Sequence, residues 1–118
     1  MSAKYNLVCD QATTFNFQFV IQDDLNGVTT PWNLTNYSAT MTVRPYVGAT
    51  TTTVVASTSN GRIVLGGATG RITVTIDATT TGDIAPSRYA YDLVLDSGSE
   101  VTRILEGKFV VTGAVTNP

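Results

Sequence analysis

Alternation of apolar and polar residues constrains the fold of this chain more than any other feature. Phe15, Phe17, Phe19 and Ile21 occupy every second position of one short stretch. Successive side chains of a β-strand point to opposite faces, so this period of two predicts a strand with one buried side. The same pattern recurs over residues 37–45, 71–77 and 89–96. No segment has the 3.6-residue period of an amphipathic helix, and a single helical turn near residues 79–84 is all that we expect.

Turn signals divide the remaining sequence into short strands. Glycine-containing or Asn-Gly turns are expected at residues 23–27, 60–61, 66–70 and 96–99. Residues 50–57 form a weaker strand with little contrast between its faces, which makes it a candidate edge strand. Residues 63–65 form a short apolar strand, and residues 32–34 a loop returning to the core. Seven or eight short strands without intervening helices predict an antiparallel β-sandwich or a small barrel.

The last expected strand, residues 100–112, is less regular. Val101, Leu105, Phe109 and Val111 would share its buried face, but Arg103 and Gly107 interrupt that face. A glycine inside a strand marks either a β-bulge or a place where another backbone comes close. Both interpretations of Gly107 remain open at this point.

Composition agrees with a single all-β domain spanning residues 1–118. At 118 residues the chain has room for one hydrophobic core. Charged residues make up only 14% of it, against about 25% in ordinary soluble domains. The chain is instead rich in threonine, with 21 residues, and in valine, with 14. Both are β-branched and fit a pleated sheet surface better than a helix.

The residue inventory argues against an enzyme. The chain has no histidine, the commonest general base and a common metal ligand. Its one cysteine, Cys9, lies beside Leu7 and Val8 and is expected to be a small buried apolar residue rather than a reactive thiol. Asp92 and Asp96 are four strand residues apart, about 13 Å, which is too far for one catalytic site. We therefore expect no catalytic residue, no metal and no cofactor.

Charge and hydropathy limit the partners. The net charge is −2. The seven basic residues are scattered along the sequence, whereas nucleic-acid binding needs a concentrated positive surface. No apolar run approaches the roughly 20 residues of a membrane helix, and the first residues lack a secretory signal pattern. We expect neither nucleic acid nor membrane as a partner, and synthesis in the cytoplasm.

Three aromatic residues are candidates for special roles. Trp32 and Tyr46 are candidate interface anchors, with Thr51 and Thr53 beside them on the weak strand, although core packing is the favoured role of Trp32. Tyr89 stands at the start of a strand after a connection. That is the position of a tyrosine corner, in which a tyrosine hydroxyl binds the upstream backbone of an immunoglobulin-like sandwich.

Three segments resemble a known group of proteins. Residues 31–44 (PWNLTNYSATMTVR) resemble a D-L-T-G-Y-x-A-x-M-x-V-R stretch, and residues 70–93 a G-x-I-x-L … G-x-Y-x-Y-D-L pattern. Residues 101–111 (VTRILEGKFVV) resemble V-x-R-L-L-x-G-x-V-x-V. These patterns are those of small tailed-phage and prophage virion proteins similar to the N-terminal immunoglobulin-like domain of the phage baseplate upper protein. Asn33 replaces the usual aspartate, and Ser87 the usual glycine.

The resemblance implies an immunoglobulin-like antiparallel β-sandwich that serves as a structural module of a phage virion, made in the bacterial host. It would attach or space parts of a tail, baseplate or fibre, bind other virion proteins, and occur in multiple copies or as a homo-oligomer. A capsid decoration (cement) protein on the phage head is the first alternative. A carbohydrate-binding host-adhesion module, with Trp32, Tyr46 and Asn60 as contacts, is the second.

Overall fold

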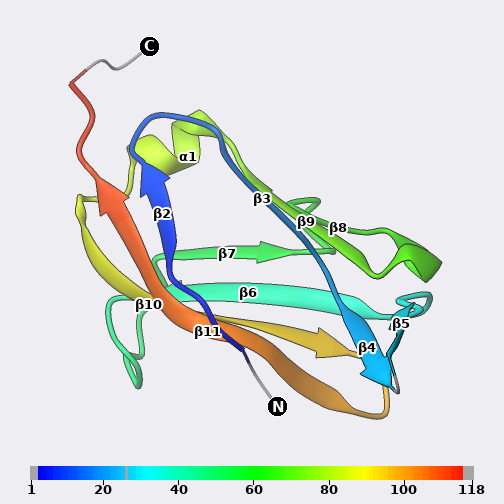
Figure 1. The fold of residues 1–118 in the computed structure, drawn as a ribbon. Helices are drawn as coiled ribbons and strands as arrows, with labels where there is room; N and C mark the ends of the chain where they lie inside the picture. The colour runs from blue at the N-terminus through cyan, green and yellow to red at the C-terminus, as the bar shows by residue number, and fades with distance from the viewer. Residues whose placement is uncertain (1–2, 26, 116–118) are drawn as a thin grey trace.

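The computed structural model describes residues 3–25 and 27–115 and shows an all-β chain with two sheets packed as a sandwich (Figure 1). The strands of the larger sheet and its attachments are β1 (Ala3–Lys4), β2 (Leu7–Asp10), β6 (Ser38–Arg44), β7 (Val54–Ser57), β10 (Ser87–Asp96) and β11 (Val101–Thr112). The smaller sheet contains β3 (Phe15–Val20), β8 (Ile63–Leu65) and β9 (Arg71–Ile76). A separate hairpin joins β4 (Gln22–Leu25) to β5 (Val28–Pro31).

The order of strands is that of an immunoglobulin domain. The larger sheet runs β1-β11-β10-β6-β7, with β2 also on β11, and the smaller sheet runs β3-β9-β8. In the larger sheet, β11, β10, β6 and β7 correspond to strands G, F, C and C′ of an immunoglobulin fold. In the smaller sheet, β3, β9 and β8 correspond to strands B, E and D. The N-terminal strand, however, pairs with β11 in parallel through β1 and β2. In constant-type domains it would pair with strand B, so here no strand of the described residues pairs with the second side of β3.

The core lies between the two sheets and follows the predicted alternation. On β6 the inward side chains are Ala39, Met41 and Val43, each at most 1% exposed. On β10 the inward residues include Leu93 and Leu95, which are fully buried. The expected burial of these two strands is confirmed. Phe109 of β11 is also fully buried, and its ring meets that of Phe15 edge-on at 5.3 Å between centroids.

The connection between β9 and β10 contains one short helix and the tyrosine corner. Helix α1 (Ala78–Gly82) occupies the place where a single helical turn was expected. After it, the Tyr89 hydroxyl donates a 2.6 Å hydrogen bond to the Ala85 carbonyl oxygen, four residues upstream. This is the geometry of the tyrosine corner, and it ties the start of β10 to the preceding turn.

Replacing Tyr89 by phenylalanine should lower the free energy of unfolding by about 1 kcal/mol, since the ring stays and one hydrogen bond is lost. Denaturant unfolding measures the difference. Tyr46→Phe is the matched control, because the Tyr46 ring is 66% exposed and its hydroxyl has no hydrogen-bond partner in the described part of the chain; its cost should stay within about 0.5 kcal/mol. Equal effects of the two substitutions would contradict a stabilising role for the corner.

Two expected element boundaries were wrong, and the number of strands is higher than expected. The backbone of Asp23 and Asp24, expected in a turn, belongs to β4. Asn26 of that expected turn lies outside the described residues. Residues 50–53 are a loop, and only Val54–Ser57 pair with β6, as the expected edge strand. The two sheets hold nine strands instead of seven or eight, because β1 and β2 are separate short pieces. The hairpin β4–β5 adds two strands to that count.

The irregularity of β11 has two separate causes. The pairing with β10 shifts between Leu93 and Val94, so that Leu93 faces Leu105 and Val94 faces Arg103. The extra residue is Ile104, and the bulge turns Val101 to the outer face, where it is 66% exposed. The expectation that Val101 shares the buried face was therefore wrong.

Gly107 marks a close approach of another backbone, and the bulge lies elsewhere. A Cβ atom on Gly107 would stand 2.3 Å from the Tyr5 carbonyl oxygen. The hydroxyl of Tyr91, which lies opposite Gly107, donates a 2.6 Å hydrogen bond to that same oxygen. The absence of a side chain at residue 107 therefore lets the N-terminal strand lie against β11.

Candidate functional site

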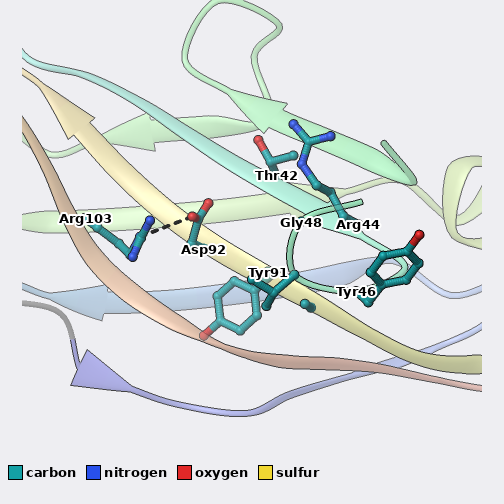
Figure 2. A pocket seen from close by; sticks show the side chains of 9 residues that line it. Thr42, Arg44, Tyr46, Gly48, Tyr91, Asp92 and Arg103 are labelled. Atoms are coloured by element: carbon teal, nitrogen blue, oxygen red, sulfur yellow. Dashed lines mark ion pairs between the residues drawn. The ribbon is translucent and has the colours of Figure 1, made fainter. Parts of the chain in front are cut away.

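The outer face of the larger sheet carries the first candidate site, a shallow polar cleft. Outward-facing Thr42 and Arg44 of β6 and Asp92 of β10 form its floor, with Arg103 of β11 beside them (Figure 2). Tyr46 and the loop that follows it stand at its rim. We call this the outer-face cleft. Its volume is about 230 Å³, below the range of about 300–1,000 Å³ that ligand pockets usually have.

Hydrogen bonds and one ion pair hold the walls of the cleft. The Arg44 guanidinium reaches the Ala49 carbonyl at 3.3 Å and the Thr52 hydroxyl at 3.2 Å, which holds the loop after β6. Arg103 Nε lies 3.2 Å from Asp92 Oδ2. Both side chains of that pair are more than one-third exposed, so the pair contributes at most about 1 kcal/mol to stability.

The fold collects charges that are far apart in the sequence. Lys4, Arg44, Arg103 and Lys108 line this cleft or the adjoining hollow of about 320 Å³. Four of the seven basic residues, scattered in the sequence, therefore gather on one face of the larger sheet. Two acidic residues lie among them: Asp92 and Glu106 face each other across β10 and β11.

The Asp92–Glu106 pair is the carboxylate pair that the sequence pattern missed. Directly opposite residues of an antiparallel pair have Cβ atoms about 5 Å apart, whereas Asp92 and Asp96 are separated along one strand. Only the pairing register of β10 with β11 brings Asp92 and Glu106 together. Both line the hollow of about 320 Å³ on the outer face, beside Arg103 and Lys108.

Three described titratable groups have a shifted pKa, and one of them, Tyr91, also lines the outer-face cleft and the adjoining hollow. Burial raises the pKa of the Cys9 thiol to about 11, and the neighbouring Asp10 charge adds to the shift. Burial likewise raises the pKa of Tyr91 to about 12. The Thr80 hydroxyl, donating a 2.7 Å hydrogen bond to Asp77, holds the pKa of that carboxyl below its usual value. Cys9, 1% exposed, is the buried apolar residue that was expected.

The second candidate site is the free edge of β3 and the groove beside it. Phe17 and Phe19 are half-buried, and the Phe17 ring stacks on Tyr5 at 5.6 Å between centroids. Two hollows of about 310 and 430 Å³ share Phe19 and Leu105 and run between β3 and β11. We call them together the side groove. Its lining is apolar apart from a few neutral polar residues and Lys4 at one end.

The edge of β3 lacks the protection that other edges of the sandwich have. On β7, the Val55 carbonyl accepts hydrogen bonds from Asn60 Nδ2 and Arg62 Nη1, each at 3.0 Å, and Asn60 Oδ1 accepts from Ser57 N. Strand β8 is only three residues long. Short strands, charges, prolines and side-chain caps are how natural sheets prevent edge pairing. Strand β3 is six residues long, with the sequence FNFQFV, and has none of these.

The expected interface residues lie at different places. Trp32 packs partly buried against the core and lines the side groove. Tyr46 stands at the outer-face cleft. Thr51 is exposed and Thr53 half-buried in the loop before β7. Asn60, the third residue of the carbohydrate alternative, caps β7, so the structure does not unite Trp32, Tyr46 and Asn60 in one site.

Among the described residues no group of three or more cysteine and acidic side chains is arranged to hold a metal ion. The same residues contain no helix long and apolar enough to cross a membrane. In comparisons with known proteins, no family model matches the chain and no curated protein matches it significantly.

Proposed function

We propose that this chain is a structural module of a bacteriophage virion, which attaches or spaces parts of the tail, baseplate or fibre apparatus by contacts with neighbouring protein chains. The observation that carries the protein-binding part is the uncapped, uncharged edge of β3 beside an apolar groove. Such an edge is a liability for an isolated monomer and an advantage for a subunit packed against others.

The virion part of the proposal rests on the resemblance, and the framework gives its motif residues physical roles. Tyr89 forms the tyrosine corner, and Gly107 admits the Tyr5 backbone. Gly70 has a φ of +71°, and a Cβ there would stand 2.4 Å from the Ile21 carbonyl oxygen. These three motif positions support the immunoglobulin-like framework, whereas the motif residues Arg44, Asp92 and Arg103 line the outer-face cleft.

Localisation on the particle tests this function. Cryo-electron microscopy of phage particles that encode the chain should reveal several copies of the sandwich in the tail, baseplate or fibres. Density on the capsomers alone would support the capsid decoration alternative instead. Particles that lack the chain by mass spectrometry, yet assemble and infect normally, would refute a structural role in the virion.

A further inference from the structure

The pairing of β3 with β9 determines which backbone groups β3 leaves free. On β9, the Thr75 N–H donates to the Arg62 carbonyl, and the Arg71 carbonyl accepts from the Gly66 N–H. The backbone N–H and C=O groups of the odd-numbered residues of β9 therefore point towards β8. The backbone groups of the even-numbered residues of β9 point towards β3, where these residues lie opposite the three phenylalanines. Peptide groups alternate in direction along a strand. The backbone N–H and C=O groups of Asn16, Gln18 and Val20 therefore point away from β9, out of the free edge of β3.

We propose that β3 pairs with β3 of a second copy of this chain, antiparallel and centred on Gln18. The two three-stranded sheets then join into one six-stranded sheet. Gln18 of one copy lies opposite Gln18 of the other, and Asn16 lies opposite Val20. This pairing rests on the proposed function, because it supplies the assembly module with its first neighbour.

Charge and side-chain pattern favour a second copy as the occupant. A strand next to its own copy doubles every charge on it, and β3 carries none of the 16 charged residues of the chain. Like charges directly opposite each other destabilise a strand pair, and a neutral edge pairs with itself without that repulsion. The outward side chains Asn16 and Gln18 are exposed amides, which hydrogen-bond well to a neighbouring strand.

The side groove supplies the apolar part of the same contact. A strand added at the β3 edge lies in the position that the first strand of a constant-type immunoglobulin domain occupies. Its inward side chains then point towards the side groove, whose wall includes Leu105 and the half-buried Phe17 and Phe19. The inward residues of the second β3 are the same half-buried phenylalanines, so the side grooves of the two copies meet with aromatic rings on both sides.

Two opposite charge substitutions at one residue test the pairing and its centre. The wild-type chain should sediment as a dimer in the micromolar to millimolar range. Gln18→Lys alone and Gln18→Glu alone should each raise the dimer dissociation constant by about tenfold or more, since each places like charges opposite each other. An equimolar mixture of the two variants should restore a dimer that contains one copy of each.

Thr75→Lys is the matched control for the charge itself. Thr75 is exposed on the same face of the same sheet, but on β9, one strand away from the edge. This variant should dimerise like the wild type. Gln18→Pro provides a second disruption, because it removes the edge N–H at a position where a strand tolerates proline. Circular dichroism and denaturant unfolding establish that all variants fold.

A wild-type chain that remains monomeric at millimolar concentration would overturn the pairing. So would an oligomer that the Gln18 variants leave unchanged, or a failure of the lysine and glutamate variants to form a mixed dimer. None of these results decides whether the chain is part of a virion, which localisation on the particle answers separately.

Discussion

Phe109→Ala should lower the free energy of unfolding by about 3–5 kcal/mol, the range for large aromatic deletions in a core. Phe109 is fully buried between the sheets, and it contacts Phe15 of the other sheet. Loss of its ring removes the apolar contacts and leaves a cavity at the centre of the sandwich. Since domains of this kind are stable by about 5–15 kcal/mol, the variant should unfold at a much lower denaturant concentration.

Val110→Ala is the control for this effect. Val110 is the next residue of β11, points to the outer face and is only half-buried. Its truncation should cost less than about 1 kcal/mol. If Phe109→Ala cost no more than Val110→Ala, the inward face of β11 would be misassigned.

Gly107→Ala should cost about 2–4 kcal/mol, an unusual loss for the addition of one methyl group. The new Cβ would stand 2.3 Å from the Tyr5 carbonyl oxygen, so the N-terminal strand must move away from β11. Overpacking of this kind costs about 1–3 kcal/mol. The Tyr91 hydroxyl also loses its acceptor at Tyr5, which adds about 1 kcal/mol.

Two measurements make the Gly107 prediction specific. Gly82→Ala introduces the same methyl group in helix α1, where its nearest neighbour would be Ala12 Cα at an ordinary 3.7 Å. That variant should be neutral or slightly stabilising. In Gly107→Ala, amide hydrogen exchange should accelerate at Tyr5, whose N–H bonds the Glu106 carbonyl. Unchanged exchange at Tyr5 would contradict the close approach as the cause.

The sequence was most informative where local pattern and buried face coincide. Met41 and Val43 of β6, and Leu93 and Leu95 of β10, occupy every second position of their strands, and all four are inward in the structure. The tyrosine corner was recognisable because Tyr89 and its acceptor Ala85 are only four residues apart. These interactions depend on near neighbours along the chain.

Features that depend on pairing between distant strands were not predictable in this way. The bulge at Ile104 reverses the orientation of Val101, and nothing in the local sequence marks its position. Asp92 and Glu106 meet only because of the register between β10 and β11. The bare edge of β3 has a similar origin. The alternation in β3 predicts a strand. Whether the N-terminal segment pairs with β3 or with β11 depends on long-range strand pairing, which the local pattern does not determine.

Amide hydrogen exchange along β3 tests the assembly role of this edge most directly. In the Gln18→Lys monomer, the amides of Asn16 and Val20 should exchange rapidly, while those of Phe17 and Phe19, bonded to β9, remain protected. Mixing with Gln18→Glu should then protect Asn16 and Val20 as well. Equal protection of all four amides in the monomer, or no gain on mixing, would contradict the account of β3 as a free edge that pairs with its own copy.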